Sequence, residues 1–143
     1  MKKAIDIIKV VDESRRKYYL AVDEDSSNLK SRLENLGYKV LSFPKGTSDK
    51  EVNRLLIENN VKYFMTKNKE HFSRFRNTNP SPTYHLIGLS SSVFGNVEQL
   101  ARTVEKAIMF DSRLKGAPIV LDIDSQYMNN LSNLIKQEKK KQK

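Results

Sequence analysis

The sequence predicts one three-layer α/β/α domain of Rossmann-like type, in which helices cover both faces of a mainly parallel sheet. From residue 18 onward, short apolar runs of strand length alternate with segments whose apolar residues recur at helical spacing. This alternation is typical of parallel sheets, because two parallel strands need a connection long enough to hold a helix. The 143 residues fit a single domain with its own hydrophobic core.

The predicted strands are apolar runs that end at polar or turn-forming residues. The first ends abruptly at an acidic triplet, and Pro44 closes the second. The five predicted strands cover residues 18–22, 40–43, 61–65, 85–89 and 118–123.

The predicted helices lie between these strands and begin at recognisable capping residues. Ser26 or Ser27 caps the first helix, and Gly37 stops it. Ser48 and Glu51 form a capping box at the start of the second. The remaining helical segments are a turn through 71–75, a helix that Asn96 caps and a final helix over 125–136, and residues 77–82 are predicted to form a loop.

Both ends of the chain lie outside this pattern. Residues 1–17 fit helical spacing and could also form a strand, and a short helix or an irregular extension is the favoured interpretation. They are treated as an N-terminal extension, so the predicted domain covers 18–137. Residues 138–143 form a basic tail, for which a solvated, frayed helix end is the ordinary explanation.

The chain is strongly basic, with a formal net charge of +9 and a pI near 9.7. A basic surface attracts polyanions and speeds their encounter with the protein. Arg74 and Arg76 stand beside Phe72 and Phe75, a combination that suits single-stranded nucleic acid. We therefore expect these two arginines to contribute to nucleic-acid binding.

The composition also excludes several kinds of site and location. The chain contains no cysteine, which excludes disulfides and thiolate zinc sites and fits a reducing compartment. The first apolar stretch is broken by Asp6 and Lys9, and no other apolar run reaches the length of a membrane span. These features predict a soluble, cytoplasmic protein with no membrane partner.

Acidic residues follow the first predicted strand directly. Asp23 is the terminal residue of that strand, and Glu24 and Asp25 come next. Acidic residues here are also favoured as ordinary helix caps, most clearly in the case of Asp25. Carboxylates brought together from separate elements are, alternatively, the hard oxygen ligands that Mg²⁺ and Mn²⁺ require.

Further polar residues occupy the starts of the next two helices. Asp49 begins the second helix, where it complements the helix dipole and, if this end faces the strand ends, reaches toward Asp23. Thr66 and Asn68 follow the third strand, and Asn68 is also suited to cap the helix after it. Because the ligand cleft of a parallel sheet lies beyond the carboxyl ends of its strands, these positions form the candidate site.

Other familiar catalytic patterns are missing. His71 and His85 have no partner at metal-ligand spacing, and we expect both to be non-catalytic. The chain has no Gly-rich phosphate loop, nucleophile elbow or HExxH motif.

Four motifs, taken in order, resemble the small PIN-like proteins. They are Tyr19 to Asp25 (YLAVDED), Leu36 to Val40 (LGYKV), Gly46 to Val52 (GTSDKEV) and Phe64 to Glu70 (FMTKNKE). The resemblance spans roughly residues 18 to 90, and the later elements fit the same layout.

This resemblance implies a Rossmann-like three-layer domain whose acidic residues bind Mg²⁺ or Mn²⁺. It also implies hydrolysis of phosphodiester bonds in single-stranded RNA, often as the toxin of a toxin–antitoxin pair, and a homodimer. Carried over by position, Asp23 and Asp49 match two of the acids, Thr66 matches the hydroxyl position, and Glu70 lies where a further acid often stands. Asp23, Asp49 and Glu70 would bind the metal, Thr66 and Asn68 would orient ligands or water, and Lys67, Arg74 and Arg76 would bind the RNA backbone.

Asn68 departs from the pattern, which has aspartate there. An amide offers one neutral oxygen and removes a negative charge, so cation binding should weaken unless Glu24, Asp25 or Glu70 compensates. A second hypothesis is therefore a non-catalytic PIN-like module that binds RNA or a protein partner. A third is a nucleotide-binding or receiver-like domain, which lacks a convincing acceptor aspartate because Asp122 and Asp124 belong to the last strand.

Overall fold

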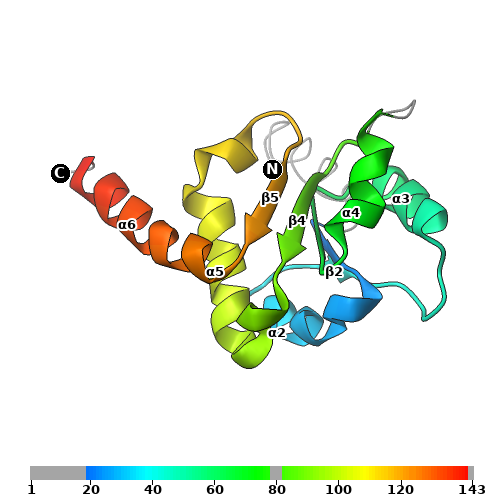
Figure 1. The fold of residues 1–143 in the computed structure, drawn as a ribbon, viewed down its shortest axis with the longest axis horizontal. Coiled ribbons are helices and arrows are strands. Elements are labelled where there is room, and N and C mark those ends of the chain that lie inside the picture. The colour runs from blue at the N-terminus through cyan, green and yellow to red at the C-terminus, as the bar shows by residue number, and fades with distance from the viewer. Residues whose placement is uncertain (1–18, 78–81, 142–143) are drawn as a thin grey trace, which may run out of the picture.

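The structure is a computed structural model that describes residues 19–77 and 82–141. The predicted extension over 1–17 and positions 78–81 of the predicted loop lie outside these residues. Five parallel strands form one sheet in the order β2-β1-β3-β4-β5 (Figure 1). The strands are β1 (Leu20–Val22), β2 (Val40–Leu41), β3 (Tyr63–Thr66), β4 (His85–Leu89) and β5 (Val120–Ile123).

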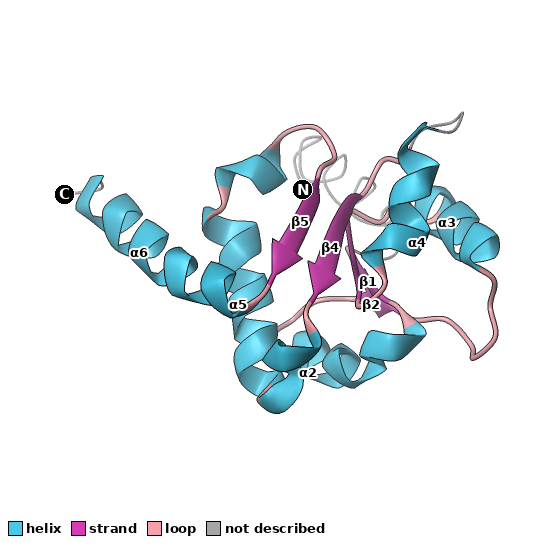
Figure 2. Ribbon diagram, viewed as in Figure 1, coloured by secondary structure: helices cyan, strands magenta, loops and turns pink. Residues whose placement is uncertain are grey.

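Helices connect the strands and cover both faces of the sheet (Figure 2). The α-helices are α2 (Lys30–Asn35), α3 (Asp49–Glu58), α4 (Lys69–Ser73), α5 (Val97–Phe110) and α6 (Ser125–Lys141). Four 3₁₀ segments accompany them within the described residues: η1 (Glu24–Leu29), η2 (Arg74–Asn77), η3 (Ser91–Gly95) and η4 (Ser112–Lys115). The predicted three-layer α/β/α fold with a parallel sheet is confirmed.

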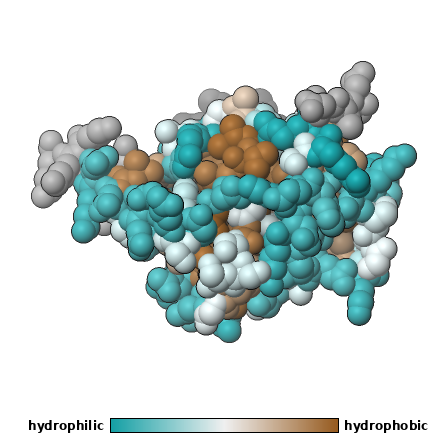
Figure 3. Space-filling model, in the orientation of Figure 1, coloured by the Kyte–Doolittle hydropathy of each residue, from teal (hydrophilic) through white to brown (hydrophobic). Residues whose placement is uncertain are grey.

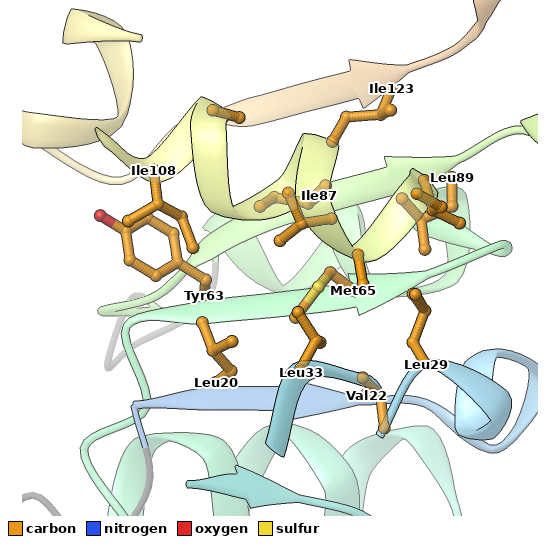
Figure 4. Close-up of a cluster of buried hydrophobic side chains, with 14 of the residues drawn as sticks. Leu20, Val22, Leu29, Leu33, Tyr63, Met65, Ile87, Leu89, Ile108 and Ile123 are labelled. Carbon is orange, nitrogen blue, oxygen red and sulfur yellow. The ribbon is translucent and has the colours of Figure 1, made fainter. Parts of the chain in front are cut away.

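The sheet separates two hydrophobic clusters, because successive side chains of a strand point to opposite faces. On one face Leu20, Met65 and Ile87 pack with residues of α2 and α5, and Leu131 of α6 joins them (Figure 4). On the other face Ala21 and Phe64 pack against α3 and α4. Burial on both faces explains why β1, β3 and β4 read as continuous apolar runs.

The first helical segment begins differently from the prediction. The predicted caps, Ser26 and Ser27, both lie inside η1, and the side chain of Asp23 accepts a hydrogen bond from Glu24 N at the start of this segment. Ser26 is unavailable as a cap because it is fully buried and its hydroxyl donates to Asp25 Oδ1 at 2.8 Å. The early turn therefore begins directly after β1.

The final helix runs from Ser125 to Lys141, past the predicted end at residue 136, and extends away from the sheet (Figure 1). In the part of the chain that the structure describes, no helix combines the length and apolar character needed to cross a membrane. Figure 3 shows a mostly hydrophilic face with an apolar area near its centre.

Candidate functional site

The candidate site lies at the carboxyl ends of β1 and β3, which are neighbours in the sheet. Asp23 follows β1 directly, and its backbone N–H donates to the carbonyl of Met65 at 2.9 Å. This bond extends the β1–β3 ladder by one step and sets Asp23 beside Thr66, the last residue of β3. The adjacency predicted from the strand ends is therefore present.

The hydroxyl of Thr66 is the centre of the site. Its Oγ1 donates to Asp23 Oδ2 at 2.8 Å and accepts from the backbone N–H of Asn68 at 3.0 Å. Asp25 Oδ2 lies 3.4 Å from the same hydroxyl. Thr66 is fully buried, and its hydrogen bonds hold the carboxylates in position.

Asp25 joins this cluster because η1 turns the chain back over the end of β3. Its carboxylate accepts hydrogen bonds from the backbone N–H of Lys67 at 3.2 Å and from Asn68 Nδ2 at 2.8 Å. The amide of Asn68 thus acts here as a donor to a carboxylate. Together, Asp23, Asp25, Thr66 and Asn68 form what we name the acid–hydroxyl cluster.

The carboxylates of the cluster influence one another electrostatically. Burial raises the pKa of Asp23 above its usual value, and the nearby charges of Asp25 and Asp49 add to that rise. Hydrogen bonds from Thr66 and from Glu24 N act in the opposite direction. A cation at this position would favour the charged form of Asp23, which the present surroundings disfavour.

Asp49 lies within electrostatic range of the cluster but contacts a different element. Ser48 caps α3 as predicted, since its hydroxyl accepts from Glu51 N at 3.2 Å. Asp49 Oδ2 lies 3.5 Å from His71 Nδ1 and 3.6 Å from an Arg74 guanidinium nitrogen. The residue is therefore paired with the segment that follows β3.

Glu70 and Glu24 lie apart from the acid–hydroxyl cluster in their contacts. Glu70 lines a small cavity of about 230 Å³ together with Lys69 and Asp122. Lys69 and Asp122 form an ion pair with each other. Glu24 Oε2 accepts instead from the backbone N–H of Gly46 at 3.4 Å. Among residues 19–77 and 82–141, no group of three or more His, Cys, Asp or Glu side chains is placed to hold a metal ion.

Two of the basic side chains predicted to bind nucleic acid lie over aromatic rings. Lys67 Nζ lies 4.1 Å from the centre of the Phe94 ring, and the Arg74 guanidinium lies 4.9 Å from that of Phe75. One guanidinium nitrogen of Arg76 donates to the carbonyl of Pro118 at 3.0 Å.

Asp25 was predicted only as one of several acids that could compensate for Asn68, since helix capping also explained it. Its position three residues after Val22, the last residue of β1, was the available signal. His85 is placed as expected for a non-catalytic residue, because it lies in β4 and its Nδ1 accepts from Ile119 N at 3.1 Å.

The donor set of the cluster fits a hard divalent cation in its chemistry. Asp23 Oδ2 and Asp25 Oδ2 both lie within 3.4 Å of one hydroxyl, so carboxylate oxygens from two positions approach the same group. Mg²⁺ is commonly held by one or two carboxylates and otherwise keeps water or substrate phosphate as ligands. Two acids are therefore a sufficient protein contribution for such an ion.

Comparison of the chain with protein-family models, curated proteins and solved structures found no match.

Proposed function

We propose that this protein is a PIN-like, Mg²⁺- or Mn²⁺-dependent nuclease that hydrolyses phosphodiester bonds in single-stranded RNA. The observation that carries the proposal is the convergence of Asp23 and Asp25 on the buried hydroxyl of Thr66, where two central parallel strands end. Ligand sites of parallel sheets lie at this edge. The motif resemblance and the net charge of +9 support RNA as the substrate.

In this proposal Asp23 and Asp25 hold the cation, and Thr66 fixes the orientation of Asp23 by donating to it. The cation, when bound, would neutralise charge on the scissile phosphate and lower the pKa of water. Lys67 and Arg74 would bind neighbouring phosphates, since Lys67 directly follows Thr66 in the chain and both side chains lie over aromatic rings. Asn68 would position Asp25.

A second candidate is a non-catalytic PIN-like module that binds RNA or a protein partner. Its supporting observation is that Asn68, in place of an acid, donates to Asp25. The carboxylate of Asp25 is then satisfied by donors of the protein itself. A cognate antitoxin, a homodimer and a cytoplasmic location belong to the proposal on the strength of the resemblance.

Calorimetric titration with Mn²⁺ and cleavage of an unstructured, labelled RNA test the proposal together. We expect Asp23→Asn to weaken Mn²⁺ binding by at least about tenfold, since even residues that only support metal ligands alter affinity by 10- to 100-fold. The same substitution should abolish cleavage. Glu98→Gln is the matched control, because Glu98 is an exposed acid on α5 that pairs with Arg102.

The outcomes separate the two candidates. Mn²⁺ binding and cleavage that both depend on Asp23 support the nuclease. RNA binding that persists in EDTA and survives Asp23→Asn, without heat from Mn²⁺, supports the non-catalytic module. Equal cleavage by the wild type and Asp23→Asn would overturn the assignment of the site.

A further inference from the structure

We propose that the small cavity beside the acid–hydroxyl cluster binds one base of the single-stranded RNA, and that Glu70 selects bases that carry an exocyclic amino group. This inference rests on the proposed function and deepens it, because it assigns a base preference to the same site. The cavity has a volume of about 230 Å³ and lies where β3, β4 and β5 end.

Direct contacts connect the cavity to the acid–hydroxyl cluster. Lys67 lines the cavity, and its backbone N–H donates to Asp25 Oδ1 of the cluster at 3.2 Å. Gly88 also lines the cavity and is the register partner of Thr66 in the β3–β4 ladder. A strand whose scissile phosphate lies at the cluster would therefore bring a neighbouring nucleotide to the cavity.

The charges of the cavity suit a base better than a phosphate. Three carboxylates and two ammonium groups line it, those of Glu70, Asp122, Asp124, Lys67 and Lys69. A surplus of carboxylates repels a phosphate, whereas the unstacked bases of a single strand present N–H donors on their Watson–Crick edges. The volume is below that of pockets for drug-sized ligands, which fits a single base. The base would occupy the cavity while its phosphate binds Lys67.

Glu70 is the carboxylate of the cavity that is available to a ligand. Asp122 forms an ion pair with Lys69, and Asp124 Oδ1 accepts from the backbone N–H of Tyr127 at 2.7 Å. In the part of the chain that the structure describes, the exposed carboxylate of Glu70 has no hydrogen-bond or ion-pair partner. A carboxylate accepts a hydrogen bond from N4 of cytosine and repels the O4 carbonyl that uracil carries at the same position.

The test is fluorescence anisotropy of the full chain with labelled oligocytidine and oligouridine, each about eight nucleotides long, in EDTA so that neither metal nor cleavage takes part. We expect the wild type to bind oligocytidine about three- to tenfold more tightly, the range that one net hydrogen bond supplies. Glu70→Gln should lose this preference, because an amide can accept from N4 and donate to O4 alike. Glu70 is exposed, so this substitution should leave the fold intact.

Two control variants separate base selection from a general effect of charge. Lys67→Gln should weaken the binding of both RNAs by the same factor and keep the preference, because a phosphate contact carries no information about the base. Glu58→Gln removes the same charge from an exposed acid at the end of α3, which leads into the opposite end of β3. It should also keep the preference.

Equal affinity of the wild type for the two RNAs, or a preference that survives Glu70→Gln, would overturn base selection by Glu70. Loss of the preference in Glu58→Gln as well would show a general charge effect and overturn it too. Failure to bind either RNA in EDTA would also overturn the inference. The nuclease proposal, in contrast, is overturned only by cleavage that does not depend on Asp23.

Discussion

The hydroxyl of Thr66 has one proton to donate, and two carboxylates lie close enough to accept a hydrogen bond from it. Asp23, at 2.8 Å, receives the hydrogen bond, while Asp25, at 3.4 Å, is supplied by other donors. Asn68 provides one of those donors and also donates its backbone N–H to the Thr66 oxygen. The neutral amide of Asn68 therefore supplies a hydrogen-bond donor to a cluster whose other side chains are two carboxylates and one hydroxyl.

Replacing Asn68 by an acid should lower the stability of the metal-free protein and raise its affinity for a cation. Asn68→Asp removes the donor to Asp25 and adds a third negative charge, so we expect a loss of about 1 kcal/mol in the free energy of unfolding without metal. With Mn²⁺, the melting temperature of Asn68→Asp should rise more than that of the wild type. Thermal unfolding with and without Mn²⁺ measures both effects.

Asn68→Ala is the control for loss of the amide alone. It should lose stability without gaining a response to Mn²⁺. If Asn68→Asp and Asn68→Ala respond alike to the metal, the cluster does not provide a cation site.

The sequence predicted Asp23 and Thr66 as neighbours because parallel strands end at a common edge, and pattern alone locates such residues. The part played by Asp25 was not predictable in the same way. Its position depends on a tight 3₁₀ turn directly after β1, and the residue type fits a helix cap equally well. The pairing of Asp49 with Arg74 depends on side-chain contacts between separate helical segments, which have no signature in the local sequence.

At the scale of elements, Lys69 of α4 reaches across β4 to Asp122 of β5. It passes over Gly88, where an added Cβ would lie 2.8 Å from both Asp122 Oδ1 and Lys69 Cδ. A side chain at this position would therefore displace Lys69 or Asp122, whereas the backbone conformation of Gly88 does not itself favour glycine. The ion pair ties α4, which follows the candidate site, to the edge strand of the sheet.

The cost of Gly88→Ala should depend on Lys69. In the wild type we expect a loss of about 1–3 kcal/mol in the free energy of unfolding, because the methyl group displaces the ion pair. In a Lys69→Ala background the same change should cost less, because the clash with Lys69 Cδ is gone while Asp122 Oδ1 and the Cβ of residue 69 remain. Urea unfolding of the four combinations measures this coupling.

A cost that stays the same in both backgrounds would contradict this explanation.

Strand β4 was predicted with its observed bounds, since it is buried on both faces and reads as one apolar run. The contact of Lys69 with Asp122 over Gly88 was not predicted, because these two residues lie 53 positions apart in the sequence.

For the molecule as a whole, protonation of His85 should change the free energy of unfolding. It is buried at the start of β4, its ring stacks on Tyr63, and its Nδ1 accepts a hydrogen bond from the backbone N–H of Ile119, next to β5. Burial lowers the pKa of His85 below its usual value, and the charges of Lys62 and Arg76 lower it further. The protonated ring could not accept the bond from Ile119.

Stability should therefore fall as the pH falls through this range. The unfolded chain, with the ordinary histidine pKa near 6.5, binds a proton that the folded chain resists, so acidification favours unfolding. We expect the free energy of unfolding to decrease between roughly pH 7 and pH 5, with a shallower slope in His85→Asn. Urea unfolding at several pH values gives both slopes.

His71→Gln is the companion variant, because His71 is an exposed histidine on α4. It should keep the slope of the wild type. Equal slopes in the wild type and His85→Asn would show that another group governs the pH dependence.

The strand order β2-β1-β3 also determines when the candidate site comes into existence during folding. Asp23 and Thr66 meet across 43 positions of sequence, and Lys67 meets Asp25 across 42. Closing a loop of that length is a late and entropically costly event compared with forming the neighbouring helices. A nascent chain that has produced β1, β2 and α3 therefore carries its acids as separate, solvated charges, and the site appears only after β3 takes its place beside β1.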